Sequence, residues 1–251
     1  MKALRSIAVI AAALAVWEIV CRAAHVSPAI LPPPSQVARK WWEYLVTGEL
    51  PRDAVATLLR VFVGFAIGAG LALPLGLWMG ARDRIYELLN PIVQLLRPIP
   101  PIAFIPLAIL WFGLGNPPAF FLISLGAFFP VLMNTIAGVR TVDAIYVRAA
   151  QNLGAPARTL FWRVLLPGAM PSILSGMRVG IGVAFIVVIV AEMIAVNSGL
   201  GYRILEAREY FWSDKILAGM ISIGVIGLAI DTVMARINHR LLRWHRGLEH
   251  A

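Results

Sequence analysis

The sequence predicts an all-α integral membrane protein that forms a single transmembrane domain over residues 1–251. Hydrophobic residues make up 60% of the chain and charged residues only 14%, whereas soluble domains carry about 25% charged residues. Several apolar runs also reach the length of about 20 residues that a helix needs to cross a bilayer. The predicted spans cover residues 6–24, 58–80, 95–113, 119–139, 173–196 and 215–236, with a cytoplasmic loop at 140–171.

The first predicted span follows Lys2 and Arg5 and stays apolar as far as Cys21. Small residues around Ala13 offer an alternative, a signal peptide that is cleaved. Because the apolar run continues beyond these residues and the rest of the chain is embedded in the membrane, we favour an uncleaved helix. Its flanking charges place the N-terminus in the cytoplasm.

A proline-rich outer loop follows the first span. Pro28 and the run Pro32–Pro34 exclude a helix at its start. Ser35 is then placed to cap a short helix from Gln36 to about Val46. The aromatic residues of this helix suit the membrane interface, so it is either an interfacial anchor or a contact for an external partner.

The second and third spans differ in their small residues and prolines. The second carries Gly64-x-x-x-Gly68 and Gly76-x-x-x-Gly80, spacings that allow helix backbones to approach closely. The third holds a dense group of prolines between 98 and 106. Prolines leave carbonyls unpaired, and such backbone is tolerated at membrane depth only inside protein or beside water. We expect a broken helix that faces the bundle interior, or a simple cytoplasmic entry point marked by prolines.

The apolar runs predict six spans with both termini in the cytoplasm, and a modest excess of basic residues on the inner side supports this orientation. The net charge is +9 and is carried mainly by arginine, which in a membrane protein indicates cytoplasmic loops rather than nucleic-acid binding. The basic residues expected on or near the inner side are Lys2, Arg5, Arg82, Arg84, Arg97, Arg140, Arg148, Arg158, Arg163, Arg178, Arg236, Arg240, Arg243 and Arg246.

The stretch from Arg148 to Pro167 is the longest moderately polar segment between the apolar runs. Its first part favours a helix, which Gly154-Ala155-Pro156 breaks, since glycine permits a positive φ and proline lacks an N–H. Residues 157–166 form a second short helix that Pro167 is expected to end. The segment is either a docking element for a partner protein or a re-entrant segment on the lipid headgroups.

Polar residues within the spans are candidates for the translocation pathway or its gate. Glu192 lies near the outer end of its span, and intramembrane carboxylates are functional by default. The alternatives are that it is hydrated near the interface or pairs with an arginine such as Arg203. Asp231 is expected to be structural. The other pathway candidates are Phe104, Pro106, Asn134 and Met193.

The polar segment resembles the cytoplasmic loop of permease subunits of binding-protein-dependent ATP-binding-cassette (ABC) importers. The family form is Glu-Ala-Ala, three residues, Gly, nine residues, Ile, any residue and Leu-Pro. This chain matches at Ala149, Ala150, Gly154 and Leu166-Pro167, and Val164 replaces the Ile, whereas Arg148 stands where the family has Glu. The resemblance assigns the coupling role to Arg148, Ala149, Ala150, Leu153, Gly154, Ala155, Pro156, Arg158, Leu166 and Pro167.

Other motifs are similar to the nitrate, sulfonate and taurine branch of these permeases. They are Leu31–Ser35, Pro98–Leu107, Trp111–Gly115, Phe128–Val131 and Ala191–Tyr202. The resemblance implies a type I importer permease in a bacterial inner membrane that pairs with a second copy, most simply as a homodimer. It also implies two cytoplasmic ATPase subunits that hold ATP and Mg²⁺, and a periplasmic or lipid-anchored binding protein that carries most of the solute specificity.

Two other classes are weaker interpretations. A gradient-driven secondary transporter or channel predicts inverted repeats and buried carboxylates, and only Glu192 is a candidate. An intramembrane enzyme needs clustered nucleophile machinery, which the sequence lacks. A single cysteine and the absence of Cys/His spacing predict no metal site. No phosphate-loop motif occurs, so we expect the chain to bind no cofactor and to catalyse no reaction itself.

Overall fold

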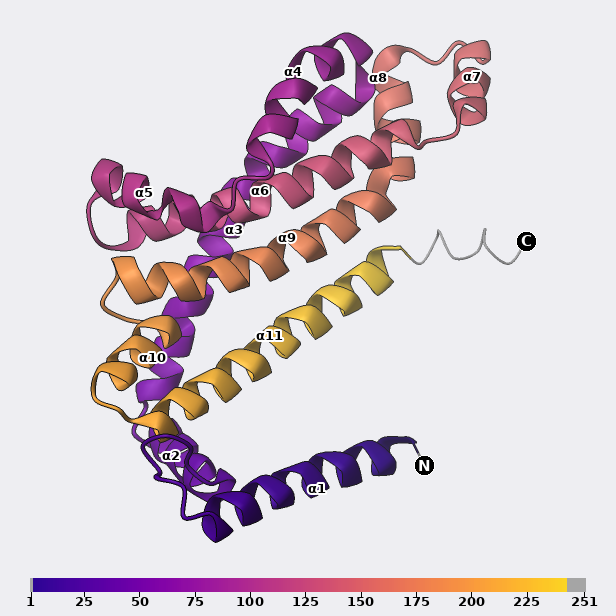
Figure 1. Cartoon of the computed structure of the whole chain (residues 1–251). Helices are drawn as coiled ribbons and strands as arrows, with labels where there is room; N and C mark the ends of the chain where they lie inside the picture. Colours follow the sequence, from indigo (N-terminus) through magenta and orange to yellow (C-terminus); the bar gives the residue numbers. More distant parts are fainter. Residues whose placement is uncertain (1, 243–251) are drawn as a thin grey trace.

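The computed structural model describes residues 2–242 as a bundle of helices (Figure 1). Within these residues no strand occurs, and the all-α membrane fold predicted from the sequence is confirmed. Four helical elements are long and apolar enough to cross a bilayer, and one bent pair of helices passes the same test. The four are α3 (Glu49–Ala81), α6 (Asn116–Arg140), the continuous element Ala157–Ala195 and α11 (Ser213–Leu241). The predicted cytoplasmic arginines Arg243 and Arg246 lie outside the described residues.

A side-chain hydrogen bond connects the first two helices across the proline-rich loop. Helix α1 (Lys2–Ala23) precedes the loop and α2 (Pro34–Val46) follows it. The Ser35 hydroxyl donates to Glu18 Oε1 over 2.8 Å rather than capping α2, which begins at Pro34. The predicted N-cap is therefore wrong, because this carboxylate on α1 competes for the hydroxyl. Cys21 is buried beside this junction, with 4% of its surface exposed.

Helix α2 lies across the start of the last span. Trp41 Nε1 donates a hydrogen bond to Ser222 Oγ on α11 over 2.9 Å, while Trp42 faces outward. The Trp41 indole thus holds α2 against the bundle, whereas the Trp42 indole is exposed on the outer surface. This arrangement agrees with an amphipathic element at the membrane interface.

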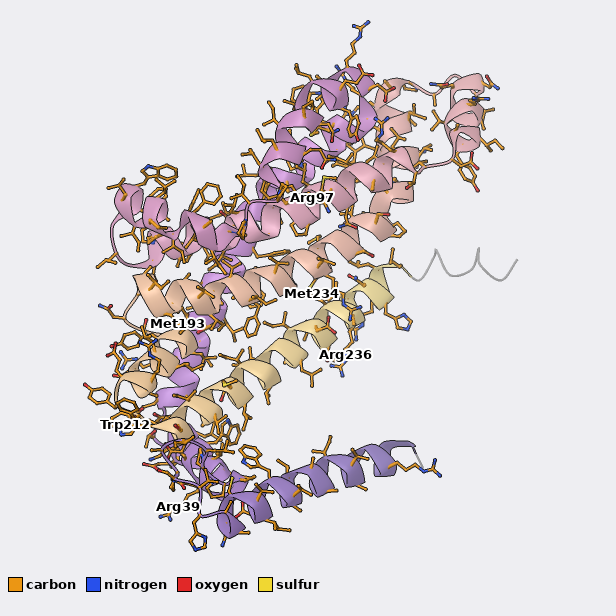
Figure 2. All side chains as sticks on the ribbon, viewed as in Figure 1. Arg39, Arg97, Met193, Trp212, Met234 and Arg236 are labelled. Carbon is orange, nitrogen blue, oxygen red and sulfur yellow. The ribbon has the colours of Figure 1, made fainter. Side chains whose placement is uncertain are left out.

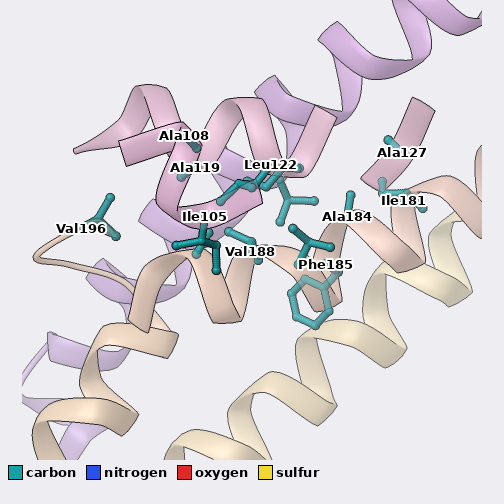
Figure 3. Packing of buried hydrophobic residues seen from close by; sticks show 14 residues of the cluster. Ile105, Ala108, Ala119, Leu122, Ala127, Ile181, Ala184, Phe185, Val188 and Val196 are labelled. Atoms are coloured by element: carbon teal, nitrogen blue, oxygen red, sulfur yellow. The ribbon is translucent and has the colours of Figure 1, made fainter. Parts of the chain in front are cut away.

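The centre of the molecule is a stack of three long helices, α3, α6 and α9 (Leu166–Ala195). Glycines permit their close approach: a Cβ added at Gly68 would overlap the carbonyl of Ser124, and one at Gly176 would lie 2.5 Å from Cβ of Asn134. The close helix contact predicted from the glycine spacing is confirmed. Figure 3 shows the buried cluster beside this stack, where Phe185 points toward α11.

The third predicted span, 95–113, is wrong in its start and right in its break. Helix α4 (Asp83–Leu96) already begins after Arg82, which is extended with φ −137°. A break follows, and then the 3₁₀ turn η1 (Pro101–Phe104) and α5 (Ile105–Phe112), bent by 80° from α4. Pro98, Pro100 and Pro101 supply no N–H donors and fix φ near −65°, so the helix cannot continue through them.

The polar segment forms α7 (Ala144–Asn152), α8 (Ala157–Leu160) and the π-helical turn η2 (Phe161–Leu165). The prediction that Pro167 ends the second helix is wrong, because η2 runs directly into α9. Pro167 lies in the first turn of α9, where a missing N–H is tolerated. A π turn before it accommodates the lost donor. The helix that contains the predicted span 173–196 therefore begins inside the predicted loop 140–171.

The arrangement gives the molecule two distinct ends. Helix α10 (Leu200–Glu209) lies beside α9 and α11. Figure 1 shows α2, α5 and α10 on the left, and α7, the start of α1 and the end of α11 on the right.

The second span also starts earlier than predicted, at Glu49 rather than residue 58.

Candidate functional site

The end of the molecule that carries α7 presents a capped helix followed by a tight turn. The Asp143 carboxylate caps α7 by accepting a hydrogen bond from the Ile145 amide over 2.8 Å. At the other end Gly154 has a φ of 77°, and the Ala155 amide donates to the Ala150 carbonyl. This is a left-handed C-terminal turn for which glycine is the natural residue.

Helix α7 has almost no support from the rest of the chain. None of its residues is buried. The apolar side chains of Ile145 and Tyr146, and of Leu153 at the following turn, are 68%, 61% and 88% exposed. An amphipathic helix with an uncovered apolar face is typical of a docking element.

The predicted coupling residues fall into two groups. The eight from Arg148 to Arg158 lie on α7, on the turn and at the start of α8, and none of them is buried. Leu166 and Pro167 are instead half-buried in the first turn of α9. Leu166 packs against the cluster of Val139, Ala169 and Ile173. The last part of the motif therefore fixes the loop to the bundle.

A cavity of about 320 Å³ lies at the break between α4 and η1. Its walls include Arg97, Ile99 and Pro101 from the break, Asn134 from α6 and Val183 from α9. The Arg97 side chain is exposed, and among the described residues no hydrogen-bond or ion-pair partner is found for its guanidinium. Figure 2 places it where α4 ends alongside α6. The break therefore brings a guanidinium and an amide to one space.

The other pathway candidates do not line this cavity. Phe104 packs edge-to-face on Phe121 with ring centroids 6.4 Å apart, and Pro106 is exposed in the first turn of α5. Met193 is half-buried near the end of α9 (Figure 2). Of the five candidates, only Asn134 faces the cavity, and its Nδ2 donates to the Pro130 carbonyl.

Glu192 is fully buried at the opposite end of the bundle, where it forms an ion pair with Arg60 on α3. Its second oxygen, Oε2, accepts from Thr57 Oγ1 and from the Gly201 amide, each over 3.0 Å. The expected partner, Arg203, instead bonds Asp53 over 2.6 Å. An ion pair between Glu192 and an arginine is therefore present, but the arginine is Arg60 of α3 rather than Arg203.

Arg60 and Asp53 fix the loop between α9 and α10. Arg60 donates to the carbonyl and the hydroxyl of Ser198, and Asp53 accepts from the Gly199 amide. Burial alone lowers the pKa of Arg203, but its hydrogen bonds to Asp53 and Glu206 raise that pKa above its ordinary value. At this end of the molecule the charged side chains of Arg60, Glu192, Asp53, Arg203 and Glu206 are all paired with one another.

The sequence carried a signal for these residues that was missed. Asp53, Thr57 and Arg60 follow each other at spacings of four and three residues, which places them on one face of a helix. A polar stripe entering an apolar span indicates buried partners on a neighbouring helix. The predicted span began at residue 58 and so cut this stripe in two.

Comparison with known proteins relates this geometry to a family. The sequence pattern of the family described as "Binding-protein-dependent transport system inner membrane component" matches residues 72–245. The chain belongs to this family. The matched region contains the broken helix, the α7–α8 turn and Glu192, but not Arg60.

Relatives and solved structures agree with this family. The permease is 37% identical to the taurine transport system permease protein TauC of Escherichia coli, over 96% of this chain and 89% of the relative. It is 36% identical to the putative aliphatic sulfonates transport permease protein SsuC of Bacillus subtilis, over 94% and 86%. The inward-facing MetNI methionine ABC transporter superposes with a TM-score of 0.65 at 18% identity, covering 73% of this chain and 92% of that one.

The permease is thus the transmembrane subunit of an ABC importer and is a transport component rather than a catalyst. Permeases of this kind work with ATPase subunits and a solute-binding protein. The gradient-driven alternative is not favoured, because the family and the relatives are those of ABC importer permeases.

Proposed function

We propose that this permease imports a small oxyanion across a bacterial inner membrane. The oxyanion is either nitrate or an aliphatic sulfonate such as taurine. The observation that carries the proposal is the cavity at the helix break, which Arg97 and Asn134 both line. A guanidinium offers planar, multiple donors that match sulfonate or nitrate oxygens. Relatives named for taurine, sulfonates and nitrate support this class of solute.

Helix α7 and the turn at Gly154 form the contact with the ATPase. The support is the uncovered face of α7 with Leu153 exposed beside it. Each of two cytoplasmic ATPase subunits, which bind ATP and Mg²⁺, takes one such helix in a groove. Arg148 then faces the ATPase, so we expect an acidic residue opposite it. Closure of the ATPases moves α7, and the motion reaches α9 through α8 and η2.

A second copy of the permease completes the pathway. The cavity at the break is open to the surroundings of a single chain, and apolar side chains such as Leu110, Leu88 and Leu228 remain exposed. A homodimer or lipid covers such surfaces in a membrane. In the proposed orientation both termini and α7 are cytoplasmic, and α2 and α10 face a periplasmic or lipid-anchored binding protein.

Uptake by proteoliposomes tests the proposal. The permease is reconstituted with its ATPase and binding protein, and ATP-dependent uptake of labelled taurine, an alkanesulfonate and nitrate is measured. We expect uptake of one of these anions and its loss in Arg97→Gln, whereas Arg84→Gln, an exposed arginine outside the cavity, transports normally. Uptake that is independent of ATP, or equal transport by Arg97→Gln, contradicts the proposal.

A further inference from the structure

A second groove lies outside the translocation cavity, at the end of the bundle that carries α7. It has a volume of about 640 Å³ and separates the last turns of α3 from α8 and η2. Its floor is apolar and consists of Pro74, Leu77, Trp78, Phe161, Trp162 and Leu165. Nothing in the function proposed above uses this groove.

Two arginines stand at the rim of the groove. Arg82 follows α3 and Arg158 lies on α8, and both side chains are exposed. They are the charged residues of the lining, and no acidic partner is found for either in the described chain. The nearest acid in sequence, Asp83, is already bound to Arg140 over 2.8 Å. The rim therefore carries two unneutralised positive charges above an apolar floor.

The tryptophans of the groove indicate its depth in the membrane. Trp78 of α3 and Trp162 of η2 both belong to this apolar floor and are 51% and 59% exposed. Indoles concentrate at the level of the lipid headgroups, where an apolar ring and a polar N–H are both accommodated. Arg82 is four residues beyond Trp78, on the side away from the membrane centre. The apolar floor thus faces acyl chains while the arginines lie at the phosphate level.

We infer that this groove binds an anionic phospholipid of the adjacent leaflet. One acyl chain lies against the apolar floor, and the headgroup phosphate lies between the guanidinium groups of Arg82 and Arg158. Basic pockets between membrane helices on the cytoplasmic side are suited to anionic headgroups, and arginine binds phosphate through paired donors. Naming the inner leaflet rests on the orientation proposed above; the lipid site itself does not.

The π turn places the bound lipid at a mechanically important position. Phe161, Trp162 and Leu165 of η2 line the groove, and η2 is also the connection from the α7–α8 turn into α9. Single π turns are frequent at functional sites. A lipid in the groove supports this connection from the α3 side. Arg158, which the sequence motif assigns to the ATPase, then contacts the headgroup instead.

Native mass spectrometry of the full-length permease tests the site. The protein is extracted from bilayers of equal phosphatidylglycerol and phosphatidylcholine, and retained lipids are counted. We expect wild type to retain phosphatidylglycerol preferentially, and the double variant Arg82→Gln/Arg158→Gln to retain at least threefold less. Arg84→Gln removes one neighbouring charge outside the groove and should retain lipid as wild type does. The double variant Arg82→Lys/Arg158→Lys keeps the charge and should restore most of the retention.

Fluorescence quenching locates the lipid. Dibrominated phosphatidylglycerol should quench the part of the emission that Trp162→Phe removes, more strongly than dibrominated phosphatidylcholine does, and the glutamine double variant should abolish this difference. Equal retention in all variants, or equal quenching by both lipids, overturns the inference. So does a glutamine double variant that keeps its lipid but loses the ATPase on copurification, because Arg158 would then be an ATPase contact. Failure of taurine or nitrate uptake leaves these lipid readouts unaffected.

Discussion

Arg60 and Glu192 form an ion pair across 132 positions of sequence, with Nη1 2.6 Å from Oε1 and both side chains almost completely buried. Each carboxylate oxygen has a donor, and the guanidinium also reaches Asn116 and Ser198. A buried pair is tolerated only when the remaining hydrogen bonds are satisfied in this way. The pair therefore ties α3, α6 and α9 together at the end opposite α7.

Removing one member of this pair should destabilise the permease strongly. We expect Arg60→Ala to lower the free energy of unfolding by about 3–5 kcal/mol, because Glu192 is left as an uncompensated buried charge. Denaturant titration of the purified protein in detergent measures this. Lys40→Ala breaks the exposed pair with Glu43 and should cause no measurable change. Equal stability of the two variants would show that the buried pair is not needed for folding.

A methyl group at Gly199 should be far more harmful than one at Gly113. Both glycines have a positive φ, 106° and 74°, so either alanine variant carries backbone strain of about 1–3 kcal/mol. A Cβ at Gly199 would also overlap the Glu192 carboxylate, whereas no atom lies within 4 Å of one at Gly113. Thermal unfolding should give a clearly lower midpoint for Gly199→Ala. Equal midpoints would mean that the carboxylate moves freely, against the network described.

Two neighbouring glycines of α3 should respond to alanine with opposite signs. Gly68 faces the Ser124 carbonyl on α6, and Gly68→Ala should cost about 1–3 kcal/mol through overpacking. Gly70 has no atom within 4 Å of an added Cβ, so Gly70→Ala should stabilise the helix by up to about 1 kcal/mol. Unfolding of both variants under one condition measures the difference. A destabilised Gly70→Ala would indicate a contact with another chain at this face.

Leu153 should matter for coupling and not for folding. Its side chain is 88% exposed, so Leu153→Ser should leave the unfolding midpoint unchanged. Loss of an apolar anchor from an interface costs about 1–2 kcal/mol, or roughly a tenfold weaker affinity for the ATPase. Binding of the purified ATPase to permease in lipid nanodiscs measures this. Leu114→Ser, a 74% exposed leucine at the other end, is the matched control, and equal effects of both variants would refute docking at Leu153.

The helical spans could be predicted where the sequence forms one long apolar run. The predictions for α6 and α11 differ from the structure by a few residues, since long apolar runs leave little choice. The polar first turns of α3 were lost because Glu49, Arg52 and Asp53 reduce hydropathy, although Asp53 is buried and bonds Gly199 and Arg203. Contacts with residues distant in the sequence stabilise the start of that helix, and a hydropathy profile carries no information about such contacts.

Proline was a less reliable guide to helix ends than its chemistry suggests. The prolines at residues 98–101 interrupt the helix as expected. At Pro167, Pro130 and Pro74, in contrast, the helix continues. Inside a bundle, π turns and neighbouring groups compensate for a lost donor. The coupling turn at Gly154 was predictable because it is local. The partner of Glu192 was not, because it lies 132 residues away along the chain.

The single cysteine of the chain, Cys21, is shielded from its surroundings. Wild-type permease should consequently react very slowly with thiol-labelling reagents. A cysteine introduced at an exposed position such as Leu153 or Leu114 would be the one thiol that a membrane-impermeant maleimide labels quickly. The side of the membrane from which each position is labelled then reports the orientation of the permease directly, in intact cells and without purification.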